Sequence, residues 1–168
     1  MQQPAWDESF SDTKIQVDSL NNKSILVTGA NGLLGRQLAS DLSQICREVH
    51  AVVRSIPTNA LQKVVYHKID FSSNWGAENL PKNIDAIIHL AQSRAFREFP
   101  QKAKDIFEVN VTSTSRMLDY AYYASCKKFL FASTGSLYKS LDRFPTETDS
   151  VLPYHELGFY PASKLCGE

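Results

Sequence analysis

The sequence has few cysteines and no pattern that would use them together. Cys46, Cys126 and Cys166 lie far apart, are odd in number and form no CxxC pair, which argues against a disulfide framework or a thiolate zinc site. The 4 histidines also lack a metal-ligand spacing. The sequence therefore predicts reduced thiols, as in a cytoplasmic protein, and no metal ion.

Long apolar runs and an excess of one charge are also missing. No run approaches the roughly 18 to 20 apolar residues of a membrane-spanning helix, and Met1 to Asn22 lacks the basic and apolar regions of a secretory signal. The 18 Lys and Arg residues balance 18 Asp and Glu residues, which argues against a general nucleic-acid-binding protein. We therefore expect a cytoplasmic protein with no membrane and no nucleic acid as partner.

The sequence does contain a regular alternation of two kinds of segment. Short runs rich in β-branched residues predict buried parallel strands, and they cover 24–28, 49–53, 63–67, 85–90 and 128–132. The first helical segment presents an apolar face made of Leu34, Leu38, Leu42 and Ile45. The second spans 101–125, with an apolar side made of Ile106, Phe107, Met117, Leu118, Ala121 and Tyr122.

This alternation indicates the fold class. Strands and helices that alternate along a chain form right-handed crossovers around a parallel sheet. We therefore predict an α/β fold with a doubly wound parallel sheet of the Rossmann type over residues 23–168. Residues 1–22 are polar and are expected to form a poorly ordered N-terminal arm. The histidines at 50, 67 and 89 fall in predicted strands, where packed, hydrogen-bonded side chains are expected.

Three glycines occupy the turn between the first predicted strand and helix. Gly29 would allow a tight turn, Gly32 a close approach of the backbone to a diphosphate, and Gly35 close helix packing. Free N–H groups and the positive helix end would then face the phosphates of a dinucleotide. The predicted cofactor-binding turn consists of Gly29, Asn31, Gly32, Leu33, Leu34 and Gly35. The alternative is a glycine-rich turn without a ligand.

The end of the second predicted strand bears on the choice of dinucleotide. An acidic residue there would accept hydrogen bonds from the ribose of NAD, whereas a basic residue can meet the 2′-phosphate of NADP. The sequence places Arg54 at this point, and Arg36 could assist. We therefore expect NADP in preference to NAD. The alternative is that Arg54 is a solvated loop residue and that the site takes either cofactor.

A tyrosine, a lysine and several hydroxyl groups form a second pattern. Tyr160 and Lys164 are four residues apart and share one face if Pro161 opens a helix. A nearby ammonium would lower the pKa of Tyr160 from its ordinary value of about 10. Ser133 and Thr134 follow the fifth predicted strand, at the sheet edge where open α/β folds bind ligands. The pattern predicts a proton-transfer site, and an ordinary helix surface is the alternative.

Five segments in this order carry a family resemblance: TGANGLLG, HLAQ, NVTSTSRMLDYA, FASTGSLY and YPASK. They resemble the extended short-chain dehydrogenase/reductase superfamily and, within it, the NAD-dependent epimerase/dehydratase family. The resemblance implies an enzyme that transfers hydride between NAD(P) and a carbinol carbon of a nucleotide-linked sugar. Gly135 and Ser136 stand where dehydratases of the family usually carry an acidic pair, so it favours an epimerase or reductase.

The resemblance also implies roles for single residues. Tyr160 would be the general acid/base, Lys164 would hold the nicotinamide ribose and lower the tyrosine pKa, and Thr134 would bond the reacting oxygen. Ser136 would assist them. Asn110 matches a helix asparagine that organises the site in the family, and the alternatives are a simple buried hydrogen-bonding residue or a direct catalytic part. The further cofactor-binding residues that it implies are Asp70, Phe71, Leu90, Ala91 and Gln92.

Members of the family continue well beyond the position that corresponds to Glu168. We therefore expect a fragment, truncated before the C-terminal substrate lobe and ending within the catalytic helix. A non-catalytic NAD(P)-binding or redox-sensing module is the second hypothesis, and an inert folding fragment is the third. The resemblance also implies a possible homodimer through helices that include the one bearing Tyr160.

Overall fold

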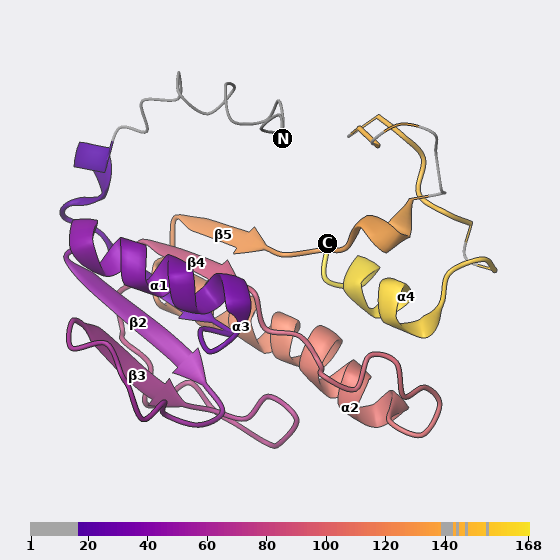
Figure 1. Ribbon diagram of the computed structural model, residues 1–168, viewed down its shortest axis with the longest axis horizontal. Helices are drawn as coiled ribbons and strands as arrows, with labels where there is room; N and C mark the ends of the chain where they lie inside the picture. The colour runs from indigo at the N-terminus through magenta and orange to yellow at the C-terminus, as the bar shows by residue number, and fades with distance from the viewer. Residues whose placement is uncertain (1–16, 139–142, 144, 147, 154) are drawn as a thin grey trace, which may run out of the picture.

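The computed structural model of the protein describes residues 17–138, 143, 145, 146, 148–153 and 155–168. Its centre is a 5-stranded parallel sheet in the order β3-β2-β1-β4-β5 (Figure 1). The strands are β1 (Ser24–Thr28), β2 (Glu48–Val53), β3 (Val64–Lys68), β4 (Ala86–His89) and β5 (Lys128–Phe131). Each lies where a β-branched run predicted it, and the predicted α/β fold of the Rossmann type is confirmed.

Helices cover both faces of the sheet. One face packs against α1 (Leu33–Ile45), and the other packs against the segment between β4 and β5. That segment consists of α2 (Ala103–Phe107), the π-helical turn η2 (Glu108–Thr112) and α3 (Ser113–Tyr123). The 3-10 turns η1 (Val17–Leu20) and η3 (Gly135–Leu137) and the helix α4 (Phe159–Leu165) are the other helical elements described. In the described part of the chain, no helix has the length and apolar character needed to cross a bilayer.

The apolar face of α1 differs in part from the predicted one. Leu42 is buried as predicted, but Leu34 is 73% exposed. The small residues Gly35 and Ala39 are buried in its place. Because small side chains allow a helix to approach a sheet closely, the contact depends less on leucine spacing than the periodicity indicates. Leu34 lies in the first turn of α1 and borders a cavity instead of the core.

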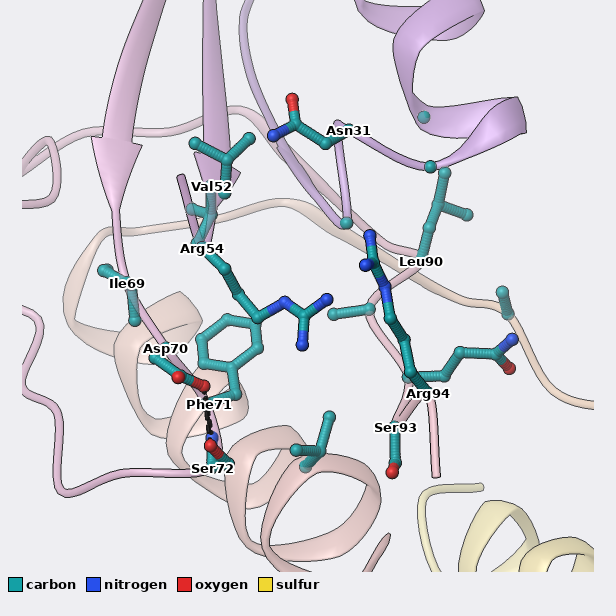
Figure 2. A pocket seen from close by; sticks show the side chains of 18 of the residues that line it. Asn31, Val52, Arg54, Ile69, Asp70, Phe71, Ser72, Leu90, Ser93 and Arg94 are labelled. Carbon is teal, nitrogen blue, oxygen red and sulfur yellow. Dashed lines mark hydrogen bonds between the residues drawn. The ribbon is translucent and has the colours of Figure 1, made fainter. Parts of the chain in front are cut away.

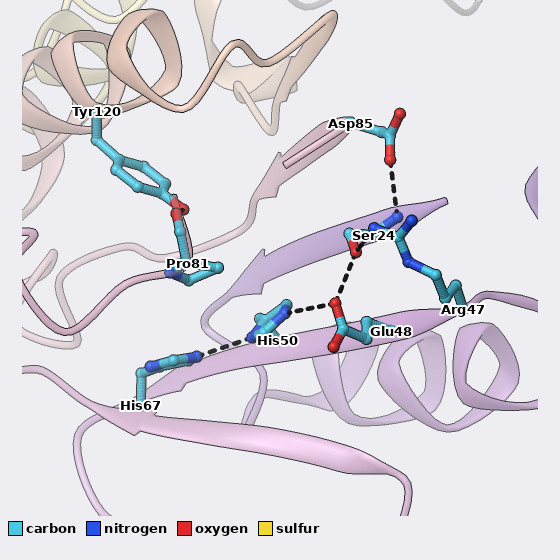
Figure 3. A network of polar contacts seen from close by, with 8 residues as sticks. All are labelled: Ser24, Arg47, Glu48, His50, His67, Pro81, Asp85 and Tyr120. Carbon is cyan, nitrogen blue, oxygen red and sulfur yellow. Dashed lines mark hydrogen bonds and ion pairs between the residues drawn. The ribbon is translucent and has the colours of Figure 1, made fainter. Parts of the chain in front are cut away.

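The second helical segment also exposes part of its predicted apolar side. Ile106, Met117 and Ala121 are buried as predicted. The three residues that are exposed against the prediction are Phe107, Leu118 and Tyr122. Tyr120 is buried although the pattern did not include it, and its hydroxyl donates to Pro81 O at 2.8 Å (Figure 3). The buried stripe of α3 therefore includes an aromatic ring with a satisfied hydroxyl group.

The predicted N-terminal arm lies partly outside the described residues. Residues 1–16 are not among them. Leu20 packs against the core beneath α1, and Lys23 N donates to Leu20 O at 2.9 Å. The last residues of the predicted arm are therefore attached to the domain.

A polar network joins the amino ends of the central strands (Figure 3). Ser24 N donates to Asp85 Oδ2, and Ser24 Oγ donates to Glu48 Oε2, each at 2.9 Å. Arg47 in turn donates to Ser24 Oγ at 2.8 Å. These bonds fix where β1, β2 and β4 begin, and so fix the relative positions of their carboxyl ends.

The strand histidines are packed and hydrogen-bonded, as predicted. His50 Nδ1 lies 3.0 Å from His67 Nε2 (Figure 3). The fully buried His89 lies between two threonines, with Nδ1 2.8 Å from Thr28 Oγ1 and Nε2 3.2 Å from Thr114 Oγ1. It therefore connects β1, β4 and α3. Burial, with a smaller contribution from the positive charge of Lys164, lowers the pKa of His89 to about 3.

The neutral state of His89 should make the stability of the fold depend on pH. Because its pKa falls from 6.5 to about 3 on folding, the unfolded chain takes up a proton first as the pH decreases. Its contribution to stability is complete above pH 6.5 and is lost between pH 6.5 and 3, at about 1.4 kcal/mol per pH unit. Urea unfolding followed from about pH 7.5 to about pH 5 should show this loss. His89→Asn should flatten the pH dependence, and an equally steep dependence in the variant would contradict the assignment.

Candidate functional site

A cavity of about 490 Å³ lies at the carboxyl ends of the strands (Figure 2). Because β2 and β4 flank β1 on opposite sides, the cavity lies at the switch point where open α/β sheets bind ligands. Every predicted cofactor residue except Lys164 lines it. These residues are Gly29, Asn31, Gly32, Leu33, Leu34, Gly35, Arg54, Asp70, Phe71, Leu90, Ala91 and Gln92. Arg36, which was expected to assist Arg54, lies outside the lining of the cavity.

The glycine turn brings the backbone after β1 against the backbone after β4. Gly29 has a φ of +66°, a left-handed conformation that residues with a side chain rarely adopt. A Cβ at Gly29 would lie 2.9 Å from Ala91 N. Gly32 N donates to Gly29 O at 2.8 Å and closes the turn. A Cβ at Gly35 would lie 2.8 Å from Ala30 Cα, so Gly35 allows α1 to pack against the turn itself.

The first turn of α1 presents unpaired backbone donors to the cavity. Gly32 is the N-cap and provides no side-chain cap, and the first turn contains no acidic residue. The N–H groups of this turn can therefore bind an anion, which the positive end of the helix also favours. Leu33 and Leu34 line the cavity and are 93% and 73% exposed. The arrangement fits a ligand that carries both phosphate groups and apolar surface.

Charged side chains extend into the cavity from several loops. Arg54 follows β2 and Arg94 follows β4, and their guanidinium groups reach in from different walls (Figure 2). After β3, Asp70 accepts hydrogen bonds from Ser72 N at 3.0 Å and Ser72 Oγ at 2.8 Å. These bonds, with a smaller effect of Arg54, lower the pKa of Asp70. The cavity therefore offers cations for phosphate and an ionised carboxylate for hydroxyl groups.

A hydrogen bond between Asn31 and the loop after β2 connects two walls of the cavity. The Asn31 side-chain amide donates to Ser55 O at 2.6 Å. This bond joins the glycine turn to the residue that follows Arg54. The side chain of Asn31 therefore positions the backbone beside Arg54.

Several lining residues were missed from the sequence. Ser93 and Arg94 directly follow Gln92. They would have been found if the predicted loop Leu90–Gln92 had been extended by two residues. Asp105 and Val109 also line the cavity, but they belong to the helical segment after that loop and carry no motif. Their contribution depends on tertiary contacts such as the hydrogen bond from Ser93 Oγ to Asp105.

The predicted proton-transfer residues come together beside the cavity. The Tyr160 phenol donates to Gln92 Oε1 at 2.5 Å, and the Thr134 hydroxyl acts to lower the pKa of Tyr160. Ser136 contributes its backbone N–H, which donates to Thr134 Oγ1 at 3.3 Å. None of these three residues lines the cavity, but Gln92 and Ser133 do. The hydroxyl cluster therefore adjoins the cavity through Gln92 and the chain after β5.

The direction of the Tyr160 pKa differs from the predicted one. Burial raises this pKa, and the Thr134 hydroxyl opposes the rise only in part. The direction is therefore opposite to the predicted one, because burial of the phenol is the largest cause. At neutral pH, Tyr160 therefore carries its proton.

Lys164 is almost completely buried, at 1% exposed. Its Nζ lies 4.2 Å from the centroid of the Phe131 ring, an arrangement that stabilises a cation. Burial lowers the pKa of Lys164 to about 8, and Glu168 opposes the change. The side chain is therefore mostly protonated at neutral pH, close to the range in which it could lose its charge.

Asn110 connects two parts of the site. It lies in η2, where the helical segment widens to a π-turn, a feature that often accompanies functional sites. Its Oδ1 accepts from Ser93 N at 2.9 Å, and its Nδ2 donates to Ser163 Oγ at 2.9 Å. The buried Asn110 side chain thus joins the loop after β4 to α4, the helix that carries Tyr160. These contacts fit the prediction that Asn110 organises the site.

A metal centre finds no support in the described residues. Within them, no three or more His, Cys, Asp or Glu side chains are arranged so that they could hold a metal ion. The cavity instead combines backbone amides, two arginines and two carboxylates, which suits an organic ligand with phosphate and hydroxyl groups.

Comparison with known families agrees with this geometry. Residues 25–168 match the NAD dependent epimerase/dehydratase family. Among curated proteins, UDP-glucose 4-epimerase 4 of Oryza sativa subsp. japonica is 25% identical over 153 residues, which are 82% of this chain and 42% of that protein. The photosystem II assembly factor Ycf39 of Cyanophora paradoxa is 29% identical over 155 residues, 86% of this chain and 45% of that protein.

Solved structures show the same similarity. The structure of MoeE5 in complex with UDP-glucose and NAD superposes with a TM-score of 0.69 at 28% identity. The match covers 86% of this chain and 46% of MoeE5. The chain therefore spans less than half the length of these relatives.

Gly29→Ala should destabilise the protein because the left-handed backbone and the Ala91 amide both exclude a Cβ. We expect a loss of about 2 to 4 kcal/mol of unfolding free energy, measured by urea denaturation. The matched control is Gly135→Ala, because a Cβ at Gly135 meets no atom within 4 Å. Equal stabilities of the two variants would contradict this account of the turn.

Proposed function

The chain belongs to the NAD-dependent epimerase/dehydratase family, and we propose that its cavity binds NADP or NAD for chemistry on a nucleotide-linked sugar. Residues 23–168 are the dinucleotide-binding unit of this proposal. Because the chain spans less than half the length of its relatives, we assign cofactor binding to the described site and sugar turnover to the whole protein. The relatives named as UDP-glucose 4-epimerase and as a complex with UDP-glucose and NAD support this substrate class.

The observation that carries the proposal is that two features line one cavity. The uncapped start of α1 is the first of them. Gln92, the hydrogen-bond partner of Tyr160, lines the same cavity. An anion-binding helix end and an acid/base group that share a cavity fit a dinucleotide whose phosphates and reactive ring lie at different points along it.

We assign the cofactor contacts according to the chemistry of each wall. The backbone amides from Gly29 to Gly35 would bind the diphosphate, and Arg94 would add a positive charge. Asp70 and Phe71 would hold the adenine end, next to the loop Leu90–Gln92. Arg54 provides a planar cation after β2, which supports a preference for the 2′-phosphate of NADP over NAD.

The chemistry proposed for the site is proton transfer coupled to redox change at a sugar carbon. The bound cofactor supplies the hydride-accepting and hydride-donating ring. Tyr160 holds a proton at its phenol oxygen and exchanges it with the substrate oxygen, which Thr134 would orient. Lys164 provides the buried positive charge that favours the phenolate when the proton leaves.

A non-catalytic dinucleotide-binding or redox-sensing module is the second candidate. It draws support from the relative named as a photosystem II assembly factor, which is 29% identical to this chain. The raised pKa of Tyr160 is also compatible with a site that binds without transferring a proton. Turnover with nucleotide sugars separates this candidate from the enzyme.

Self-association is a further part of the proposal. The outer side of α3 exposes Leu118, Tyr122 and Tyr123. Exposed apolar side chains on one helix are compatible with the homodimer that the family resemblance implies.

Gly32→Asp should weaken dinucleotide binding by at least about tenfold relative to Gly32→Asn. Both side chains cap a helix start well and have nearly the same shape, but the carboxylate repels the diphosphate. The dissociation constants can be measured by isothermal titration calorimetry with NADP+ and NAD+.

The two variants should unfold at similar temperatures, which separates binding from folding. Equal affinities of the Asp and Asn variants would contradict the assigned diphosphate position. The parent chain should bind NADP+ more tightly than NAD+ because of Arg54, and equal or tighter NAD+ binding would contradict that preference.

Tyr160→Phe should retain dinucleotide affinity and lower turnover by roughly 10² to 10⁴-fold, because it removes the proton-transferring group and little else. Turnover is measured on the whole protein, to which it is assigned, with UDP-, GDP- and dTDP-linked sugars. The exposed Tyr122 provides the control variant Tyr122→Phe, which should keep full turnover. Undiminished turnover in Tyr160→Phe would refute the assigned role, and cofactor binding without sugar turnover in the whole protein would favour the second candidate.

A further inference from the structure

The phenol hydrogen of Tyr160 is directed at a side chain that belongs to another part of the chain. Tyr160 lies on α4, and its Oη donates to Oε1 of Gln92, 68 residues earlier, at 2.5 Å. A phenol has a single hydrogen to donate. While this bond is made, that hydrogen is not available to another acceptor.

Thr134 is a second group that acts on the Tyr160 phenol. Its Oγ1 accepts a hydrogen bond from Ser136 N at 3.3 Å, which leaves the hydroxyl hydrogen of Thr134 to be donated. The Thr134 hydroxyl acts on the Tyr160 pKa in the direction that favours the phenolate. The phenol itself donates to Gln92 Oε1.

The backbone on both sides of Gln92 is fixed by buried hydrogen bonds. Ala91 N donates to Thr28 Oγ1 at 3.1 Å, and Ser93 N donates to Asn110 Oδ1 at 2.9 Å. The Gln92 side chain itself is exposed and lines the cavity. An exposed amide on a rigidly held backbone is well placed to make one directed contact and to release it without disturbing the core.

The tyrosine ring also makes an aromatic contact with the loop after β4. The Phe96 ring lies 5.3 Å from the Tyr160 ring, and the Arg97 guanidinium lies 5.1 Å above Phe96. These contacts limit how far the phenol can turn away from Gln92. The amide and the phenol therefore form a pair whose relative positions are set by the loop after β4.

We propose that Gln92 is a positioning residue for Tyr160: its side-chain carbonyl oxygen holds the phenol hydrogen and competes for it with the oxygen of an incoming substrate. This proposal rests on the function proposed above. A substrate oxygen that accepts the phenol hydrogen must displace Gln92 Oε1, because the phenol has one hydrogen to donate. Gln92 thereby keeps the acid form of Tyr160 in place until a substrate oxygen replaces it.

The chemistry of the acceptor predicts opposite effects of two substitutions. A neutral amide oxygen that accepts from the phenol stabilises the protonated form, so Gln92→Ala should lower the pKa of Tyr160. A carboxylate accepts more strongly and repels the phenolate, so Gln92→Glu should raise it. A purely structural role of Gln92 would not produce shifts of opposite sign.

The test places 3,5-difluorotyrosine at position 160 and follows its ionisation by ¹⁹F NMR. Fluorine lowers the phenol pKa, so the titration occurs at a pH where the protein remains folded. Relative to the parent, the pKa should fall by about half a pH unit to one pH unit in Gln92→Ala and rise by at least as much in Gln92→Glu. The control Gln37→Ala changes an exposed glutamine of α1, whose side chain donates to Asp41 at 2.9 Å, and should leave the pKa unchanged.

An unchanged pKa in Gln92→Ala, or shifts of the same sign in both variants, would overturn the proposal. The measurement needs neither a cofactor nor turnover, so it is independent of the proposed function. Failure of dinucleotide binding with opposite pKa shifts would reject the proposed function and retain the Gln92–Tyr160 contact. Dinucleotide binding with no pKa shift would retain the proposed function and reject the role of Gln92.

Discussion

The close contact between the turn after β1 and the loop after β4 is the constraint on which the site depends. Gly29 approaches Ala91 so closely that no side chain fits between them, and Ala91 N donates to Thr28 Oγ1 at 3.1 Å. Thr28 also holds His89 at 2.8 Å. The ends of β1 and β4 are thus joined by buried contacts. The start of α1 and the side chain of Gln92 are positioned as a consequence, one from each loop.

Hydrogen bonds connect this junction to segments that are distant in sequence. Ser93 follows the junction and bonds Asn110, and Asn110 bonds Ser163 on α4. The Tyr160 phenol returns to the same loop at Gln92. The two steps through Asn110 are buried, whereas the step from Tyr160 to Gln92 joins exposed side chains. The buried steps therefore limit the relative placement of α4 and the cavity.

The sequence predicted the parts of the structure that depend on local pattern. The β-branched runs located the strands because a strand covered on both faces must be apolar throughout, and the turn at Gly29 was visible because its conformation requires glycine. Periodicity was less reliable where tertiary packing decides burial: Leu34 and Tyr122 are exposed although their spacing suits a core face. The pKa direction of Tyr160 could not be predicted, because it depends on burial by segments far away in the chain.

The π-turn η2 holds one residue more than a regular α-helical turn, and Asn110 lies within it. Asn110 bonds two partners from different segments, while α2 and α3 on either side bury Ile106 and Met117. Because a π-turn takes up its extra residue within one widened turn, loss of one residue from Glu108–Thr112 would return the segment to α-helical winding with the two helices in nearly the same orientation. The buried faces of α2 and α3 would stay in place, and the direction of the Asn110 amide would change. The widened turn therefore sets where this amide points, independently of the packing of the helices around it.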